Sequence, residues 1–172
     1  MQRQVPYAQA IATKYPEQVV IGIAKDPQGK CNPISLGWSM ITSHAPPMLA
    51  VSVGKRRYSL EAFRQARQFV VAFPSVQQAR ETLVFGTKSG RDADKLALAA
   101  AETQPAEKID CVLLADAVAN FECRLVGELE TGDHVIFVGE VVCSHVNDRP
   151  VGRLYIVGPG HALAGVRRSD QE

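Results

Sequence analysis

One stretch of this chain decides its fold: CNPISLGWSMIT, residues 31–42. Its even-numbered positions from 34 to 40 are apolar, and its odd-numbered positions from 35 to 39 are serine, glycine and serine. A period of two predicts a β-strand with one apolar face and one face of unusually small residues. Such a small face favours close approach of another backbone or of a flat ligand. Trp38 is predicted to lie in the core, with a ring-stacking platform as the alternative.

Other β-rich segments lie on both sides of this stretch, at residues 18–25, 48–53, 68–73, 119–125, 134–146 and 154–157. Turn residues such as Thr131-Gly132-Asp133 separate them. Three short helices are predicted: residues 60–67 after an N-cap at Ser59, residues 75–86 opened by a Ser75/Gln78 capping box, and residues 92–102 capped by Asp92. About six or seven strands without a βα rhythm favour a mainly β fold, an antiparallel barrel with short helices.

Length and composition narrow the class of protein. The 172 residues are 46% hydrophobic and 22% charged, which is enough for one domain over residues 1–172. Nineteen basic and 18 acidic residues leave a net charge of +1, so composition supports neither a nucleic-acid nor a membrane partner. Residues 1–15 hold no apolar block typical of a secretory signal, and we expect the cytoplasm. The polar residues 167–172 are predicted to fray.

The sequence nominates no metal site and no familiar catalytic motif. The four cysteines are scattered without a CxxC pair, and the four histidines lack close ligand spacing, so we predict buried free thiols and no metal. Gly158-Pro159-Gly160 lacks the third glycine of a dinucleotide fingerprint. Neither a phosphate-binding P-loop nor a GxSxG nucleophile elbow is present.

Two loops carry clustered positive charge. Lys55-Arg56-Arg57-Tyr58-Ser59 joins three cations to a hydroxyl at a helix start, and residues 87–95 hold two lysines and an arginine within a polar stretch. A phosphate group needs cations together with directed hydrogen-bond donors. The alternative is that both loops are simply solvated.

Six segments together resemble the flavin reductase-like family, whose flavoredoxin-type members form an FMN-binding split barrel. The resemblance covers roughly residues 5 to 146 in the family's order, and the chain after Val146 resembles nothing in it. The segments that carry it are residues 32–39, 45–53, 69–74, 86–95, 121–124 and 132–141.

The resemblance implies a homodimer that holds FMN, less often FAD, at the subunit interface. The strand from Asn32 to Ser39 would then lie along the flavin ring, with Asn32, Ser35 and Trp38 among its contacts. His134 would lie near the nicotinamide of NAD(P)H, as the one catalytic candidate. The residues expected around the ribityl chain and phosphate are Val53, Gly54, Arg57, Ser59, Thr87, Lys88, Ser89 and Lys95.

Three functions remain open at this point. The first is an FMN-dependent oxidoreductase that passes hydride from NAD(P)H to flavin and electrons onward, to a monooxygenase partner or another acceptor. The second is a flavoredoxin-type electron carrier without direct NAD(P)H activity. The third is a split-barrel binding module for another ligand such as haem. The first function requires no general acid or base from the protein, which agrees with the absence of a catalytic motif.

Overall fold

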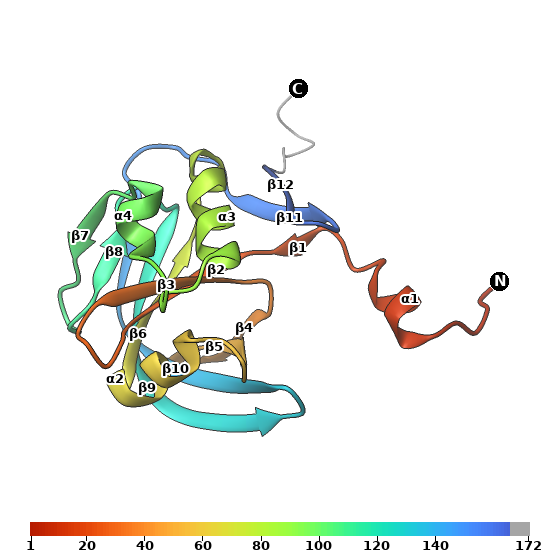
Figure 1. Ribbon diagram of the computed structural model, residues 1–172, viewed down its shortest axis with the longest axis horizontal. Coiled ribbons are helices and arrows are strands. Elements are labelled where there is room, and N and C mark those ends of the chain that lie inside the picture. The colour runs from red at the N-terminus through yellow and green to blue at the C-terminus, as the bar shows by residue number, and fades with distance from the viewer. Residues whose placement is uncertain (166–172) are drawn as a thin grey trace.

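An antiparallel seven-stranded sheet forms the body of the computed structural model, which describes residues 1–165 (Figure 1). The predicted fraying of residues 167–172 lies outside the described residues. Hydrogen-bonded neighbours follow the order β3-β2-β6-β9-β10-β5-β4. The strands are β2 (Val20–Lys25), β3 (Cys31–Leu36), β4 (Ser39–His44), β5 (Pro47–Gly54), β6 (Gln68–Phe73), β9 (Ala119–Thr131) and β10 (His134–Val146).

Two small sheets and five short helical segments flank this body. One sheet has the order β1-β11-β12, and the other pairs β7 with β8. The remaining elements are α1 (Tyr7–Ile11), β1 (Glu17–Gln18), α2 (Ser59–Ala66), η1 (Val76–Gln78), α3 (Ala79–Thr87), α4 (Lys95–Ala99), β7 (Thr103–Pro105), β8 (Val112–Leu114), β11 (Leu154–Gly158) and β12 (Ala162–Gly165). None of the helices within residues 1–165 has the length and apolar character required to cross a membrane.

The sheet packs on both of its faces, as strands with near-continuous apolar runs require. Inside the curved sheet, Phe63 of α2 contacts Phe69 and Phe137, with ring centroids 5.0 and 5.4 Å apart. On the outer face, Ile21 and Ile23 belong to a second cluster with Phe85 of α3 and Ala99 of α4. The hydrogen-bonded order begins at β3 and ends at β4, so the sheet is open between these two edges, as in a split barrel.

The deciding stretch forms two strands rather than one. Residues 31–36 pair with β2 at one edge of the sheet, and residues 39–44 pair with β5 at the other. Gly37 and Trp38 make the corner, where the Trp38 carbonyl accepts from the Ser52 N–H at 2.9 Å. The apolar face therefore leaves the core after the corner. Trp38 is 50% exposed and Met40 55%, which corrects the expected core position of Trp38.

Most predicted elements form, with differences at their ends. The hairpin turn forms between β9 and β10 with Gly132 at φ +50°, and Gln78 accepts from the Ser75 N–H as its capping box requires. Helix α4 ends at Ala99, and its cap is Asp94 rather than Asp92. Ser59 is the first residue of α2 rather than its cap. Of the four cysteines, Cys111 and Cys123 are buried, whereas Cys31 and Cys143 are partly exposed.

Candidate functional site

Three connected hollows lie along the edge where residues 34–39 cross from β3 to β4. We call them the inner cleft, about 260 Å³, the cationic pocket, about 210 Å³, and the outer groove, about 490 Å³. The inner cleft shares Ile34, Arg57 and Gly86 with the cationic pocket. It shares its other end, which includes Trp38 and His134, with the outer groove. The three hollows therefore form one elongated site.

Small residues form part of the lining of the inner cleft, and two of them, Ser35 and Gly37, belong to the small face that the sequence pattern predicts. The small lining residues are Ser35 of β3, Gly37 of the corner after it, Ser52 and Gly54 of β5, and Gly86 of α3. The Ser35 hydroxyl is already engaged, because it donates to the Thr82 carbonyl at 2.6 Å. Without large side chains on this wall, a planar ring has room to lie close to the backbone.

Trp38 and His134 stand at the rim between the inner cleft and the outer groove. Their rings are 4.6 Å apart and tilted by 42°. His134 Nδ1 lies 2.7 Å from Asp133 Oδ1, which orients the imidazole, and this contact lowers the pKa of the Asp133 carboxyl. The arrangement favours a platform for a ring over the core role first expected for Trp38. Ser39 lines only the outer groove.

The cationic pocket brings the two basic loops together. Arg57 and Ser59 come from the first loop, and Thr87, Lys88, Ser89 and Lys95 come from the second. Arg56 and Arg91 add two further cations, and no carboxylate is among the residues that line this pocket within the described chain. The local charge is therefore strongly positive although the net charge of the chain is only +1.

Lys95 is the most informative residue of this pocket. It is 4% exposed, and its ammonium donates to the Phe85 carbonyl at 3.4 Å, near the C-terminal end of α3. Burial, together with the nearby Arg57 charge, lowers its pKa to about 8. A buried cation beside a second cation is costly unless an anion compensates both. The pocket is thus built for an anionic group.

Asn32 supports the pocket from behind. Its side-chain amide donates to the hydroxyl of Ser59, a residue that lines the cationic pocket, at 2.7 Å. The Asn32 Oδ1 atom is buried and has no hydrogen-bond partner within the described residues. A Cβ atom on Gly90 would lie 2.1 Å from this oxygen, so only glycine fits there. Asn32 therefore reaches the cationic pocket only through Ser59, and it lines none of the three hollows.

Val53 is the second predicted residue that lines none of the three hollows. It is fully buried in the inner core, opposite Val135 of β10. The alternation along β5 gives the physical reason, since Ser52 and Gly54 face the cleft and Val53 must face the opposite side. Only its backbone is available to a ligand.

Several lining residues were not predicted from the sequence. In the cationic pocket, Arg56, Gly90 and Arg91 lie in polar loops, and this polarity was their only signal in the sequence. The remainder comes from segments distant in sequence, including the chain after Val146, which packs beside β1 through β11. The unpredicted inner-cleft residues are Lys14, Glu17, Val19, Ser52, Thr82, Leu83, Gly86, Ile156, His161 and Leu163.

Comparison with known proteins agrees with this architecture. The family profile described as "Flavin reductase like domain" matches residues 12–160, beyond the point where the sequence resemblance ended. The structure is similar to that of flavoredoxin from Methanosarcina acetivorans, at 26% identity and a TM-score of 0.85, over 98% of this chain and 92% of that one. Flavoredoxin of Desulfovibrio vulgaris (Miyazaki F) shares the fold at 22% identity and a TM-score of 0.84, over 98% and 94% of the two chains.

Curated relatives match over shorter segments. A reductase component of 4-nitrophenol 4-monooxygenase/4-nitrocatechol 2-monooxygenase from Rhodococcus opacus is 36% identical over 60% of this chain and 54% of its own length. An uncharacterized protein of Archaeoglobus fulgidus is 33% identical over 66% of this chain and 64% of its own length. The chain thus spans between about half and two thirds of the length of these two relatives.

Proposed function

This chain belongs to the flavin reductase-like family, and on that premise we propose that it is an FMN-dependent oxidoreductase that accepts hydride from NAD(P)H. The single observation that carries FMN is the cationic pocket, where buried Lys95 and exposed Arg57 have no carboxylate among the lining residues. FMN ends in a phosphate, and such a group would neutralise both cations.

The residues of the elongated site suit the parts of FMN in order. The cations and the Ser59 hydroxyl would hold the phosphate. The small residues of the inner cleft would accept the ring, and Trp38 and His134 would border it. When bound, flavin supplies two-electron chemistry with a nicotinamide as donor. The role of the protein would be to orient the ring, to exclude water from one side of it and to hold His134 against Asp133.

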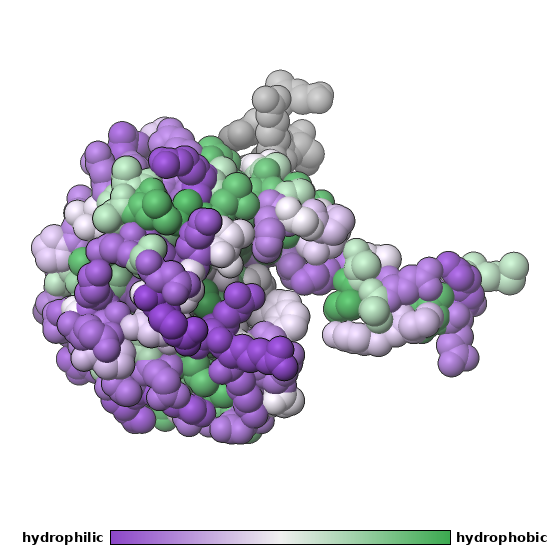
Figure 2. Space-filling model, viewed as in Figure 1, coloured by the Kyte–Doolittle hydropathy of each residue, from purple (hydrophilic) through white to green (hydrophobic). Residues whose placement is uncertain are grey.

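We also propose that the chain acts as a homodimer. β4 is an edge strand, and on it Met40 is 55% exposed and Ile41 64% exposed. An exposed apolar edge next to an open groove is a poor surface for a monomer. The arm of residues 1–15 stands away from the rounded body in Figure 2, and its helix α1 has no buried residue. Both features support a second copy of this chain that covers the outer groove.

A flavoredoxin-type electron carrier is the second candidate. The likeness to the flavoredoxin of M. acetivorans favours this candidate. The elongated site could bind FMN without a nicotinamide, as an electron carrier requires. In both cases the electron acceptor is a separate molecule, and a monooxygenase is one candidate, since the relative from R. opacus is a reductase component.

One set of measurements tests the proposal. We expect the purified protein to show a flavin spectrum, alone or after FMN is added, and not the Soret band that a haem-binding module would give. Steady-state oxidation of NADH and NADPH with FMN present should turn over repeatedly for a reductase, whereas a carrier would bleach without turnover. Arg57→Ala should weaken FMN binding strongly, and the control Arg124→Ala, at an exposed position of β9, should not. A protein that fails to bind FMN at micromolar concentration would refute the proposal.

A further inference from the structure

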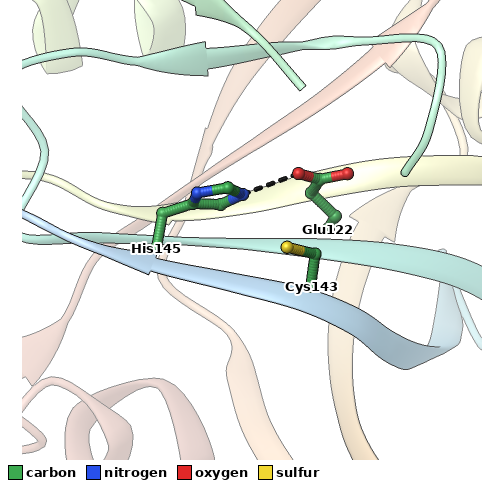
Figure 3. A group of neighbouring side chains, drawn as sticks. All are labelled: Glu122, Cys143 and His145. Atoms are coloured by element: carbon green, nitrogen blue, oxygen red, sulfur yellow. Dashed lines mark hydrogen bonds and ion pairs between the residues drawn. The ribbon is translucent and has the colours of Figure 1, made fainter. Parts of the chain in front are cut away.

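A second group of reactive side chains lies at the far end of the β9–β10 ribbon. Figure 3 shows Glu122 from β9 facing Cys143 and His145 from β10. One carboxylate oxygen, the Cys143 sulfur and an imidazole nitrogen all lie within 4.8 Å of one another. Along β10, Cys143 is nine residues from His134, which corresponds to roughly 30 Å of strand. The cluster is therefore separate from the flavin site.

A β-bulge in β10 assembles this cluster. Val141 pairs with Cys123, but the next pair is Cys143 with Glu122, so Val142 and Cys143 together oppose one residue of β9. Without the extra residue, the valine alone would face Glu122. Cys143 and His145 are two residues apart and lie on the same side of the strand. Bulges that re-aim a side chain are typical of functional positions in sheets.

Glu122 is held rigidly by the backbone. It is fully buried, and it accepts from the N–H groups of Glu107, Lys108 and Ile109 at 2.7 to 3.1 Å. His145 Nε2 lies 2.6 Å from the same carboxylate. Fixed hydrogen bonds of this kind orient the carboxylate ligands of metal sites. The other two side chains are partly exposed, so an ion has a path from solvent.

We propose that Glu122, Cys143 and His145 bind a Zn²⁺ ion. One sulfur, one nitrogen and one oxygen are donors that zinc accepts in tetrahedral sites, with water as the fourth ligand. Ca²⁺ and Mg²⁺ prefer oxygen donors only and would reject the thiolate. On binding, Cys143 loses its thiol proton to solvent, and His145 coordinates through neutral Nε2 with its proton on Nδ1. The ion takes the place of the proton that now joins His145 and Glu122.

The sequence alone predicted no metal, because ligand spacing along the chain was absent. Glu122 and Cys143 are 21 residues apart, and only the register of β9 against β10 brings them together. The bound ion would tie the loop at residues 107–109 to both strands through Glu122. It would stabilise the native state by mass action.

Cobalt is the probe that tests this site, because Co²⁺ replaces Zn²⁺ and reports sulfur ligation by a charge-transfer band. The full chain is freed of metal with a chelator, kept reduced, and titrated with Co²⁺ in a difference spectrum against the metal-free sample. We expect one Co²⁺ per chain with a thiolate band. Cys143→Ser should abolish the band and weaken binding by about 100-fold, and His145→Gln should weaken it similarly. Cys31→Ser and His44→Gln are the matched controls and should leave both unchanged.

A second measurement uses only the unaltered protein. Added Zn²⁺ should slow alkylation of Cys143 by about tenfold, as followed by peptide mass, and should leave the rate at Cys31 unchanged. If Cys143→Ser binds the metal as tightly as wild type, or if Zn²⁺ fails to protect Cys143, the cluster is only a hydrogen-bonded clamp and the proposal is wrong. Neither readout involves flavin, so the result is independent of the proposed function.

Discussion

Replacement of Lys95 by methionine separates phosphate recognition from ring recognition. Lys95→Met keeps an apolar side chain of similar length in the same buried space but removes the charge that lines the cationic pocket. Loss of one partner of a buried charge pair costs about 3 kcal/mol, which is roughly a hundredfold in affinity. We therefore expect FMN to bind about 100-fold more weakly. Riboflavin lacks the phosphate, and its affinity should change by less than about threefold.

The same substitution should stabilise the flavin-free protein. Burial and the Arg57 charge lower the pKa of Lys95 from 10.5 to about 8. At neutral pH, where Lys95 is charged, this shift corresponds to a loss of roughly 3 kcal/mol in the free energy of unfolding. The lost hydrogen bond to Phe85 offsets about 1 kcal/mol of this gain. Between pH 8 and 10.5 the unfolded wild type binds the proton and the native state does not, so wild-type stability rises with pH across this window. The methionine variant should lack that rise.

Two assays check this prediction. Flavin fluorescence titration measures both affinities, and urea denaturation at pH 7 and pH 10 measures the free energy of unfolding. Lys30→Met, at a position mostly exposed beside Asp94, is the control and should alter neither. Equal losses of FMN and riboflavin affinity, or an unchanged FMN affinity, would refute the assignment of the phosphate to this pocket.

Three further predictions follow from local geometry. Gly90→Ala forces a Cβ atom within 2.1 Å of a buried oxygen, so it should lower the free energy of unfolding by about 1–3 kcal/mol in urea, whereas Gly127→Ala, with open space around it, should lower it by less than about 1 kcal/mol. The neighbouring Cys111 thiol and the Lys25 charge lower the pKa of Cys31, and burial raises the pKa of Cys123 to about 12. Iodoacetamide at pH 8 should therefore label Cys31 first, and the reverse order by peptide mass would contradict this. Ile41→Lys adds a charge to the exposed edge strand and should convert the proposed dimer to monomer in analytical ultracentrifugation.

Local sequence patterns were sufficient to predict features that depend only on residues close together in the chain. The strand at residues 68–73 forms with its predicted bounds, because a run that contains two valines and two phenylalanines ends at Pro74. Charge and hydroxyl chemistry made the two basic loops candidates for anion binding, with solvated loops as the alternative. The family resemblance then assigned six of their residues to the flavin phosphate and ribityl chain, and these six residues line one pocket. The Ser75/Gln78 capping box is likewise a property of four consecutive residues.

Local patterns failed where the answer lay in a distant neighbour. The alternation through residues 34–40 continues without interruption, yet the chain turns at Gly37 and Trp38 and leaves Met40 outside. Periodicity cannot report such a corner, because a strand that changes partner keeps the same period. The segment after Val146 carries no motif, but β11 and β12 contribute Ile156 and Leu163 to the inner cleft.

The amino-acid sequence alone thus determined where most strands form, which strand carries small residues on one face and which loops carry positive charge. Each of these features depends on residues close together in the chain. The tertiary structure alone decided which of these features meet. It joined two loops 30 residues apart around Lys95, and it used one bulged residue in β10 to set Cys143 opposite Glu122. Strand register and the crossing of a chain from one sheet edge to the other depend on residues far apart in the sequence, so a local side-chain pattern cannot predict them.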